Sequence, residues 1–337
     1  MKSYQSHIAR LASDRAARAD EPSRPLIYEC RGDQPSLDHF CEWLHQESSR
    51  LLAESTEWGA VLFRGFPVRD SHDFDRVVSS FGLENFPYYE SLSNAVRINY
   101  TPRVFSANEA PPTVKIYLHH EMAQTPIYPE RLFFFCQQPA AEGGQTPLCR
   151  SDLLWQTIEQ TFAEFAERCR CLGLRYTHVM PPEEDFGSGM GRSWASTLRA
   201  SSTEEAEARL RQLGYQWEWL NDRSLRVTTP RLPAVLQIDG ERRSFFNQLL
   251  AAYQGWKDSR NDPAGAVRFA DGSTIDGSIV GQIAQIAEAI TYDHSWQQGD
   301  VLLLDNRVVM HGRRIFSGLR KVLASLAEPR KNCWTDS

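Results

Sequence analysis

Two histidines and one glutamate of this 337-residue chain have the types and order needed to hold a metal ion. His119 and Glu121 are separated by one residue in the segment LHHEM, residues 118–122. Alternate side chains of a β-strand share a face, so a strand here would direct both side chains towards one metal ion. Alone, the H-x-E pattern is weak evidence, because a solvated polar strand has it too.

A third candidate ligand, His311, follows the apolar segment GDVLLLDNRVVMH, residues 299–311. The apolar run predicts a buried strand that ends in a polar turn, with His311 presented shortly afterwards. Two histidines and one carboxylate form the facial triad typical of non-haem Fe(II) oxygenases, with coordination positions left open. A core histidine would explain His311 by itself, but the pair His119 and Glu121 makes it a strong candidate ligand.

A candidate anion site comes from Arg320, in GLRK at the start of the last predicted strand. A guanidinium binds a carboxylate with two parallel hydrogen bonds, which a lysine such as Lys321 does less well. Thr146 offers a hydroxyl in GGQTP, residues 143–147, where the glycine pair predicts a tight turn that another group can approach closely. Taken alone, Arg320 would be interpreted as a surface arginine at a strand start.

The elements that must position these residues are predicted from apolar periodicity and turn signals. Helices are predicted over residues 36–55, 70–82, 151–173, 203–214 and 277–291, and strands over 58–68, 115–122, 131–139, 225–238, 242–248, 299–306 and 320–328. Strands therefore lie on both sides of a mainly helical segment at about 151–224. This order argues against a doubly wound parallel sheet and favours a mostly β fold with α insertions, namely a double-stranded β-helix (jelly-roll) core flanked by helices. We expect one domain over residues 1–337, with 151–224 as an insertion or lid.

Composition excludes several classes of protein. The formal charge of −6, from 37 basic and 43 acidic residues, gives no reason to expect nucleic acid or an anionic membrane as a partner. No apolar run approaches 18 residues, so no membrane span is expected. Seven cysteines in no regular spacing argue against a disulfide framework and favour a reducing, cytoplasmic location. The Arg-rich residues 1–21 lack the apolar centre of a secretory signal and are predicted to form a surface helix or tail.

Taken in order, His-x-Glu, YPERLFFFCQQPAAEGGQTPL, FFNQ and LLLDNRVVMHGRRIFSGLRK closely resemble the TauD/TfdA-like superfamily of Fe(II)/2-oxoglutarate dioxygenases. Within it, LHHEM and YPERLFFFC resemble the syringomycin-biosynthesis (SyrP-like) branch, and matching segments run from about residue 58 to 328. The resemblance implies a double-stranded β-helix. It also implies that His119, Glu121 and His311 bind iron. Arg320 and Thr146 would then bind the far carboxylate of 2-oxoglutarate, and Asn247, in FFNQ, would line the site.

The resemblance also implies the reaction, in which Fe(II), 2-oxoglutarate and O2 oxidise a C–H bond and release succinate and CO2. Related halogenases replace the carboxylate ligand by a small residue, so Glu121 indicates hydroxylation, with desaturation or cyclisation as alternatives. The implied substrate is an amino acid or a derivative in antibiotic or other specialised-metabolite biosynthesis, free or tethered to a peptidyl carrier protein. A homo-oligomer remains open.

Competing interpretations are a metal-free β-helix binding protein and a zinc hydrolase that uses the same triad. Loss of a triad member would have favoured the binding protein, and a hydrolase leaves Arg320 and Thr146 unexplained. The chain also offers candidate substrate contacts, which are more simply explained as surface or structural arginines: Arg103, Arg192 and Arg307. Three further histidines are predicted to be structural: His120, His178 and His294.

Overall fold

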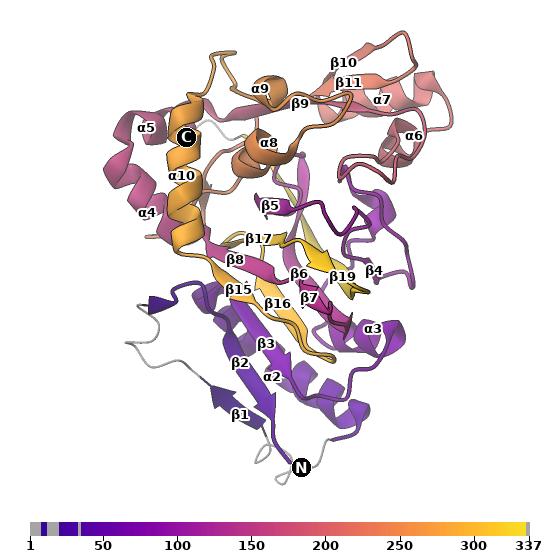
Figure 1. The fold of residues 1–337 in the computed structure, drawn as a ribbon, viewed down its shortest axis with the longest axis vertical. Coiled ribbons are helices and arrows are strands. Elements are labelled where there is room, and N and C mark those ends of the chain that lie inside the picture. Colours follow the sequence, from indigo (N-terminus) through magenta and orange to yellow (C-terminus); the bar gives the residue numbers. More distant parts are fainter. Residues whose placement is uncertain (1–7, 12–19, 33–34, 335–337) are drawn as a thin grey trace.

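Two packed β-sheets form the core of the computed structural model, which describes residues 8–11, 20–32 and 35–334 (Figure 1). The larger sheet has the strand order β1 (Ile8–Leu11), β2 (Leu26–Cys30), β3 (Ala60–Arg64), β16 (Val301–Asp305), β6 (Ile127–Gln138), β19 (Lys321–Lys331) and β4 (Phe105–Ser106). The smaller sheet has the order β15 (Tyr292–His294), β8 (Thr146–Arg150), β17 (Val309–Arg313) and β5 (Ile116–His119). Only β2 and β3 pair in parallel among these strands; every other pair in the two sheets is antiparallel.

Strand β16 shows why the apolar run in the sequence is continuous. It pairs with β3 on one side and β6 on the other. Val301 and Leu303 pack into a cluster with helical residues, whereas Leu302 and Leu304 pack into the cluster between the two sheets. Because both faces of the strand are covered, residues 301–304 are all apolar, and the buried Asp305 at the end of the strand is paired with Arg131 and Arg307.

Helices α2 (Leu37–Trp58) and α3 (Ser71–Ser79) cover the outer face of the larger sheet. Their predicted starts are confirmed, because the Ser36 hydroxyl accepts from the His39 amide and the Asp70 carboxylate caps α3. The strand predicted from residue 58 begins later, since α2 continues to Trp58 and ends at Gly59, whose φ of 86° suits glycine.

A second group of helices packs on the far face of the smaller sheet, where they bury residues of β5, β8 and β17. These helices are α4 (Ser151–Thr161), α5 (Ala163–Leu172), α8 (Leu249–Gly255) and α10 (Gly277–Ala289). Next to them lies a third sheet of β10 (Gln216–Trp219), β11 (Leu225–Thr228), β9 (Leu174–Met180) and β14 (Val267–Phe269), with α6 (Trp194–Leu198), α7 (Thr203–Leu213) and α9 (Pro263–Ala266). The segment 151–224 thus contributes β9 and β10 as well as four helices.

Short elements complete the fold: the pairs β12 (Leu236–Gln237) with β13 (Arg243–Ser244) and β7 (Glu142–Gly143) with β18 (Phe316–Ser317), and the 3-10 turn η2 (Tyr88–Glu90). The prediction of a mostly β, double-stranded β-helix with helical insertions is confirmed. In the described part of the chain, no helix combines the length and apolar character that crossing a membrane requires. Of the predicted N-terminal helix or tail, only residues 8–11 and 20–21 are described, and 8–11 form β1.

Candidate metal centre and active site

His119 and His311 meet because strands β5 and β17 pair. The two residues lie directly opposite each other in the antiparallel register, and their ring centroids are 4.4 Å apart. The Glu121 Oε2 atom lies 3.9 Å from Nε2 of His119 and 3.7 Å from Nε2 of His311. One ligand atom from each residue can be chosen so that all three lie within 4.8 Å of one another. The three side chains predicted as metal ligands therefore converge on one point.

The prediction that Glu121 lies on a strand is wrong, because β5 ends at His119 and Glu121 belongs to a turn. Asn306, which is fully buried, fixes this turn: its Oδ1 accepts from the Glu121 amide at 2.8 Å and its Nδ2 donates to the Glu121 carbonyl at 3.0 Å. Met122 then takes a positive φ of 60°. The two hydrogen bonds from the Asn306 side chain, termed the Asn306 clamp, therefore fix the direction of the Glu121 carboxylate. The sequence analysis did not predict this role of Asn306.

The protonation states of the triad suit a divalent metal. Burial opposes ionisation of Glu121, but the charge of Arg97 and contacts with the two histidines hold its pKa below the usual range. Burial likewise lowers the pKa of His311, so its imidazole is neutral. His119 Nδ1 donates to the Tyr117 carbonyl at 2.8 Å, which leaves the Nε2 lone pair facing the other ligands. Two imidazole nitrogens and one carboxylate are a fitting donor set for Fe(II).

Two cavities meet at the triad, and His119 and Glu121 line both. The smaller cavity, of about 40 Å³, extends between the sheets to Thr146, Arg313 and Arg320. The larger, of about 190 Å³, opens on the other side and is bounded by α8 and the loop 187–190. A metal ion held by the triad would therefore face one cavity on each side.

The smaller cavity carries uncompensated positive charge. Among the described residues, no carboxylate lies within ion-pair distance of Arg313 or Arg320. Burial, joined by the nearby charge of Arg313, lowers the pKa of Arg320 to about 10, and burial lowers that of Arg313 to about 10. Arg313, which sequence reasoning missed, donates only to neutral carbonyls, including those of Ala110 and Val114. Such a cavity favours an anionic occupant.

The tight turn predicted at Gly143 and Gly144 is wrong, because Gly143 ends β7, which pairs with β18, and Thr146 begins β8. Gly144 has a φ of 69°, which favours glycine, and a Cβ on it would lie 3.0 Å from Cδ of Arg320, so a larger residue would press on the arginine. Arg320 Nε donates to the Gly144 carbonyl at 3.0 Å. The Thr146 hydroxyl accepts from Trp296 Nε1 at 3.0 Å, which leaves its own hydrogen for an acceptor.

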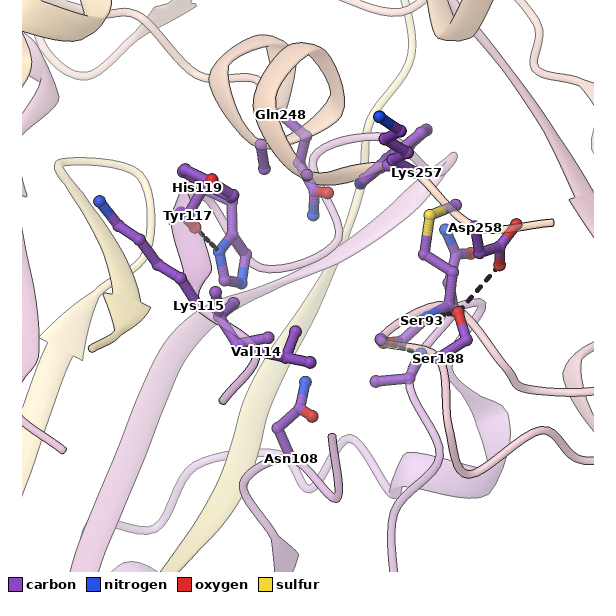
Figure 2. Close-up of a pocket in the computed structure, with 18 of the residues that line it drawn as sticks. Ser93, Asn108, Val114, Lys115, Tyr117, His119, Ser188, Gln248, Lys257 and Asp258 are labelled. Carbon is purple, nitrogen blue, oxygen red and sulfur yellow. Dashed lines mark hydrogen bonds between the residues drawn. The ribbon is translucent and has the colours of Figure 1, made fainter. Parts of the chain in front are cut away.

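The larger cavity is lined by amides, hydroxyls and ammonium groups. Figure 2 shows His119 on one side of it and Ser188 and Asp258 on the other. The Ser188 hydroxyl donates to Asp258 at 2.9 Å, and the same carboxylate accepts from Arg260. This bond ties the loop 187–190 to the segment after α8. Gln248 also faces the cavity and donates to the His120 carbonyl at 3.0 Å.

Several residues considered from sequence do not line either cavity. Asn247 is one: its amide donates to the Ala234 carbonyl and accepts from the Leu249 amide, so it supports the start of α8, next to Gln248. Lys321 lies over the Tyr100 ring, at 4.6 Å from its centroid, and is also outside both linings. The three arginines considered as substrate contacts also lie outside both cavities. Arg192 donates to residues 91–93 and to α6, Arg307 donates to Asp305, and Arg103 lies 3.9 Å from Asp75.

The buried histidines outside the triad are expected to make stability fall in mild acid. Burial lowers the pKa of His120 and His294 to about 3 and that of His178 to about 4. Between these values and about 6.5 the unfolded chain binds more protons than the folded one, so the free energy of unfolding decreases as pH falls, by at most ~1.4 kcal/mol per pH unit for each histidine. Urea denaturation at pH 7.5, 6.5 and 5.5 measures this. A midpoint that stays constant or rises towards pH 5.5 would contradict it.

Comparisons with known proteins agree with this architecture. The family model "Taurine catabolism dioxygenase TauD, TfdA family" matches residues 31–326. The chain is 40% identical over 294 residues to a clavaminate synthase-like protein of Arabidopsis thaliana, covering 87% of this chain and 88% of the relative. It is 29% identical over 307 residues to the dapdiamide synthesis protein DdaC of Enterobacter agglomerans, with coverages of 87% and 88%. The fold is similar to that of PvcB from Pseudomonas aeruginosa, with a TM-score of 0.53 at 14% identity, covering 95% of this chain and 90% of that one.

Proposed function

The chain belongs to the TauD/TfdA family of dioxygenases, and from this premise we propose that it is a non-haem Fe(II), 2-oxoglutarate-dependent oxygenase acting on an amino acid or an amino-acid derivative. The observation that carries the proposal is the buried triad beside a small cavity with two uncompensated guanidinium groups. A metal site alone would fit a hydrolase equally well, and it is the cationic cavity next to the triad that favours a carboxylate-bearing cosubstrate.

In this proposal His119, Glu121 and His311 hold iron. Arg320 binds the far carboxylate of 2-oxoglutarate and the Thr146 hydroxyl donates to it, while Arg313 adds positive charge to the same cavity. When bound, iron with 2-oxoglutarate and O2 supplies the power to oxidise a C–H bond, with release of succinate and CO2. The protein orients these groups, and the buried aromatic and aliphatic walls, such as Phe134 and Val322, exclude water from them.

The larger cavity is the proposed substrate site. Its amides, hydroxyls and ammonium groups suit a small polar molecule that carries its own charges. The relative DdaC is named for dapdiamide synthesis, and the resemblance to the SyrP-like branch points the same way. We therefore propose an amino acid or its derivative from specialised metabolism, presented free or on a peptidyl carrier protein. Hydroxylation is the proposed outcome, because Glu121 occupies the position that is vacated in halogenases.

The remaining proposals concern the whole chain. We place residues 1–337 in one oxygenase domain, with 151–224 as the insertion from which the loop 187–190 reaches the substrate cavity. Asn247 supports this site through α8. A cytoplasmic location is proposed from the irregular cysteine spacing.

An anaerobic titration tests the cofactor assignment. Fe(II) followed by 2-oxoglutarate is expected to produce a weak visible metal-to-ligand charge-transfer band, because the keto and C1 carboxylate oxygens must both reach the metal. Succinate is the matched control, since it lacks the keto group and should give no band. Absence of the band with 2-oxoglutarate would contradict the proposal and favour a hydrolase or a binding protein. Succinate release with free amino acids and with carrier-bound aminoacyl thioesters then identifies the substrate form.

A further inference from the structure

Arg97 is a buried arginine at the junction of the two cavities that neither the sequence motifs nor the proposed function uses. It lines both cavities, and its side chain is 5% exposed. Nη2 donates to both oxygens of Glu121, at 3.0 Å to Oε1 and 3.1 Å to Oε2, while Nε is buried without a hydrogen-bond partner. The ion pair between Arg97 and Glu121 is therefore a buried charge pair beside the proposed metal site, where removing either partner has a large effect.

The surroundings of Arg97 hold its guanidinium in place. It lies over the rings of Tyr88 and Phe105, at 4.8 and 5.3 Å from their centroids. The next residue, Ile98, is tied to Ser106 of β4 through its amide and its carbonyl, at 2.9 and 2.8 Å. The backbone and the two aromatic faces therefore direct this side chain at Glu121 without help from a ligand.

The two carboxylate oxygens of Glu121 differ in their surroundings. The shortest contacts from the Nε2 atoms of His119 and His311 are both to Oε2. Arg97 donates to both oxygens, at 3.0 Å to Oε1 and 3.1 Å to Oε2, so Oε2 is shared between Arg97 and the histidines while Oε1 faces Arg97. A metal ion between the histidines would therefore meet Oε2 first and could leave the bond from Arg97 to Oε1 intact.

We propose that Arg97 is a positioning residue that holds Oε1 of Glu121, so that the carboxylate offers only Oε2 to the metal. This inference rests on the proposed function. If Glu121 bound through both oxygens, it would occupy one of the positions that the keto acid and O2 require. The positive charge of Arg97 also repels a metal cation while it attracts the 2-oxoglutarate dianion. Removing the positive charge of Arg97 should therefore change the affinity for the metal ion and the affinity for 2-oxoglutarate in different ways.

The test compares Arg97→Met, which keeps much of the volume but not the charge, with Arg97→Lys, which keeps the charge. Mn(II) affinity of the metal-free protein and 2-oxoglutarate affinity of the Mn(II) protein are measured without turnover, by titration calorimetry. We expect Arg97→Met to bind Mn(II) as tightly as wild type or more tightly, and 2-oxoglutarate roughly 10- to 100-fold more weakly. The 2-oxoglutarate affinity of Arg97→Lys should lie between those of wild type and Arg97→Met. Arg103→Met is the matched control, because Arg103 lies near Asp75 and outside both cavities.

A thermal-shift series provides a second readout. In Arg97→Met the buried Glu121 loses its counter-charge until metal binds, so Mn(II) should raise the melting temperature more than it does in wild type. Unchanged affinities for both ligands, or equal losses of both, would overturn the inference: the first would mean no role for Arg97 and the second a general structural one. Failure of the wild-type protein to bind Mn(II) and 2-oxoglutarate would instead refute the proposed function.

Discussion

His311→Ala is expected to reduce succinate formation to below ~1% of the wild-type rate and to abolish tight Fe(II) binding. Loss of a residue that only orients a ligand already costs 10- to 100-fold, so loss of a ligand should cost more. The imidazole is buried, and without it only His119 and Glu121 remain as ligands. This pair is expected to hold the metal too weakly for turnover. Succinate release and equilibrium Fe(II) binding under anaerobic conditions measure the two effects separately.

The control for this variant is His72→Ala, which removes an exposed imidazole at the start of α3, far in the chain from the triad. Circular dichroism of both variants shows whether the fold is kept, since a cavity is left at the buried site. A folded His311→Ala protein with near wild-type turnover would show that His311 is not a ligand. Exogenous imidazole offers a further check, because it should restore part of the metal binding in the cavity that the substitution creates.

Arg320→Met is expected to weaken 2-oxoglutarate by roughly 100-fold while leaving Fe(II) binding nearly unchanged. The guanidinium is partly buried and has no carboxylate partner, so its positive charge is available to the cosubstrate. Removing one member of a buried charge pair commonly costs 2–5 kcal/mol, about 30-fold or more in affinity. The apparent KM for 2-oxoglutarate and the concentration that gives half of the charge-transfer band should rise together.

Lys321→Met is the matched control, because it removes the neighbouring charge that lies over Tyr100 and outside the small cavity. If Lys321→Met weakened 2-oxoglutarate binding as much as Arg320→Met does, the assignment of Arg320 as the specific carboxylate-binding residue would be wrong. Thr146→Val, which keeps the shape, should cost less, about 3- to 10-fold, since it removes one neutral donor. If Arg320→Met lost metal and cosubstrate equally, the arginine would be part of the fold and not of the anion site.

The arrangement separates two electrostatic tasks around one metal. Arg313 and Arg320 supply positive charge in the small cavity, where a dianion would lie. Arg97 supplies it at the open junction, already paired with Glu121. A cosubstrate bound first in the small cavity would leave the larger cavity free for the substrate.

Local patterns in the sequence predicted many of the elements because their causes are local. The N-cap residues Ser36 and Asp70 mark helix starts through hydrogen bonds within one turn. The apolar run of β16 reports burial on both faces. Strands β8 and β17 were missed, because each is a short segment containing Pro, Gly, Arg or His, and it is pairing within the smaller sheet that makes them strands.

The sequence by itself predicted the chemistry that we propose for the site: a metal ion at His119, Glu121 and His311, beside a carboxylate-binding Arg320 with Thr146. The tertiary structure alone decided how these residues meet. Antiparallel register places His311 opposite His119, and the Asn306 clamp, not strand alternation, aims Glu121. Arg97 lies outside the quoted motifs, and Arg313 lies inside the last of them without standing out there, because the effect of an arginine depends on which distant segments bury it beside a charge or a cavity. Such contacts depend on long-range pairing, which no local pattern encodes.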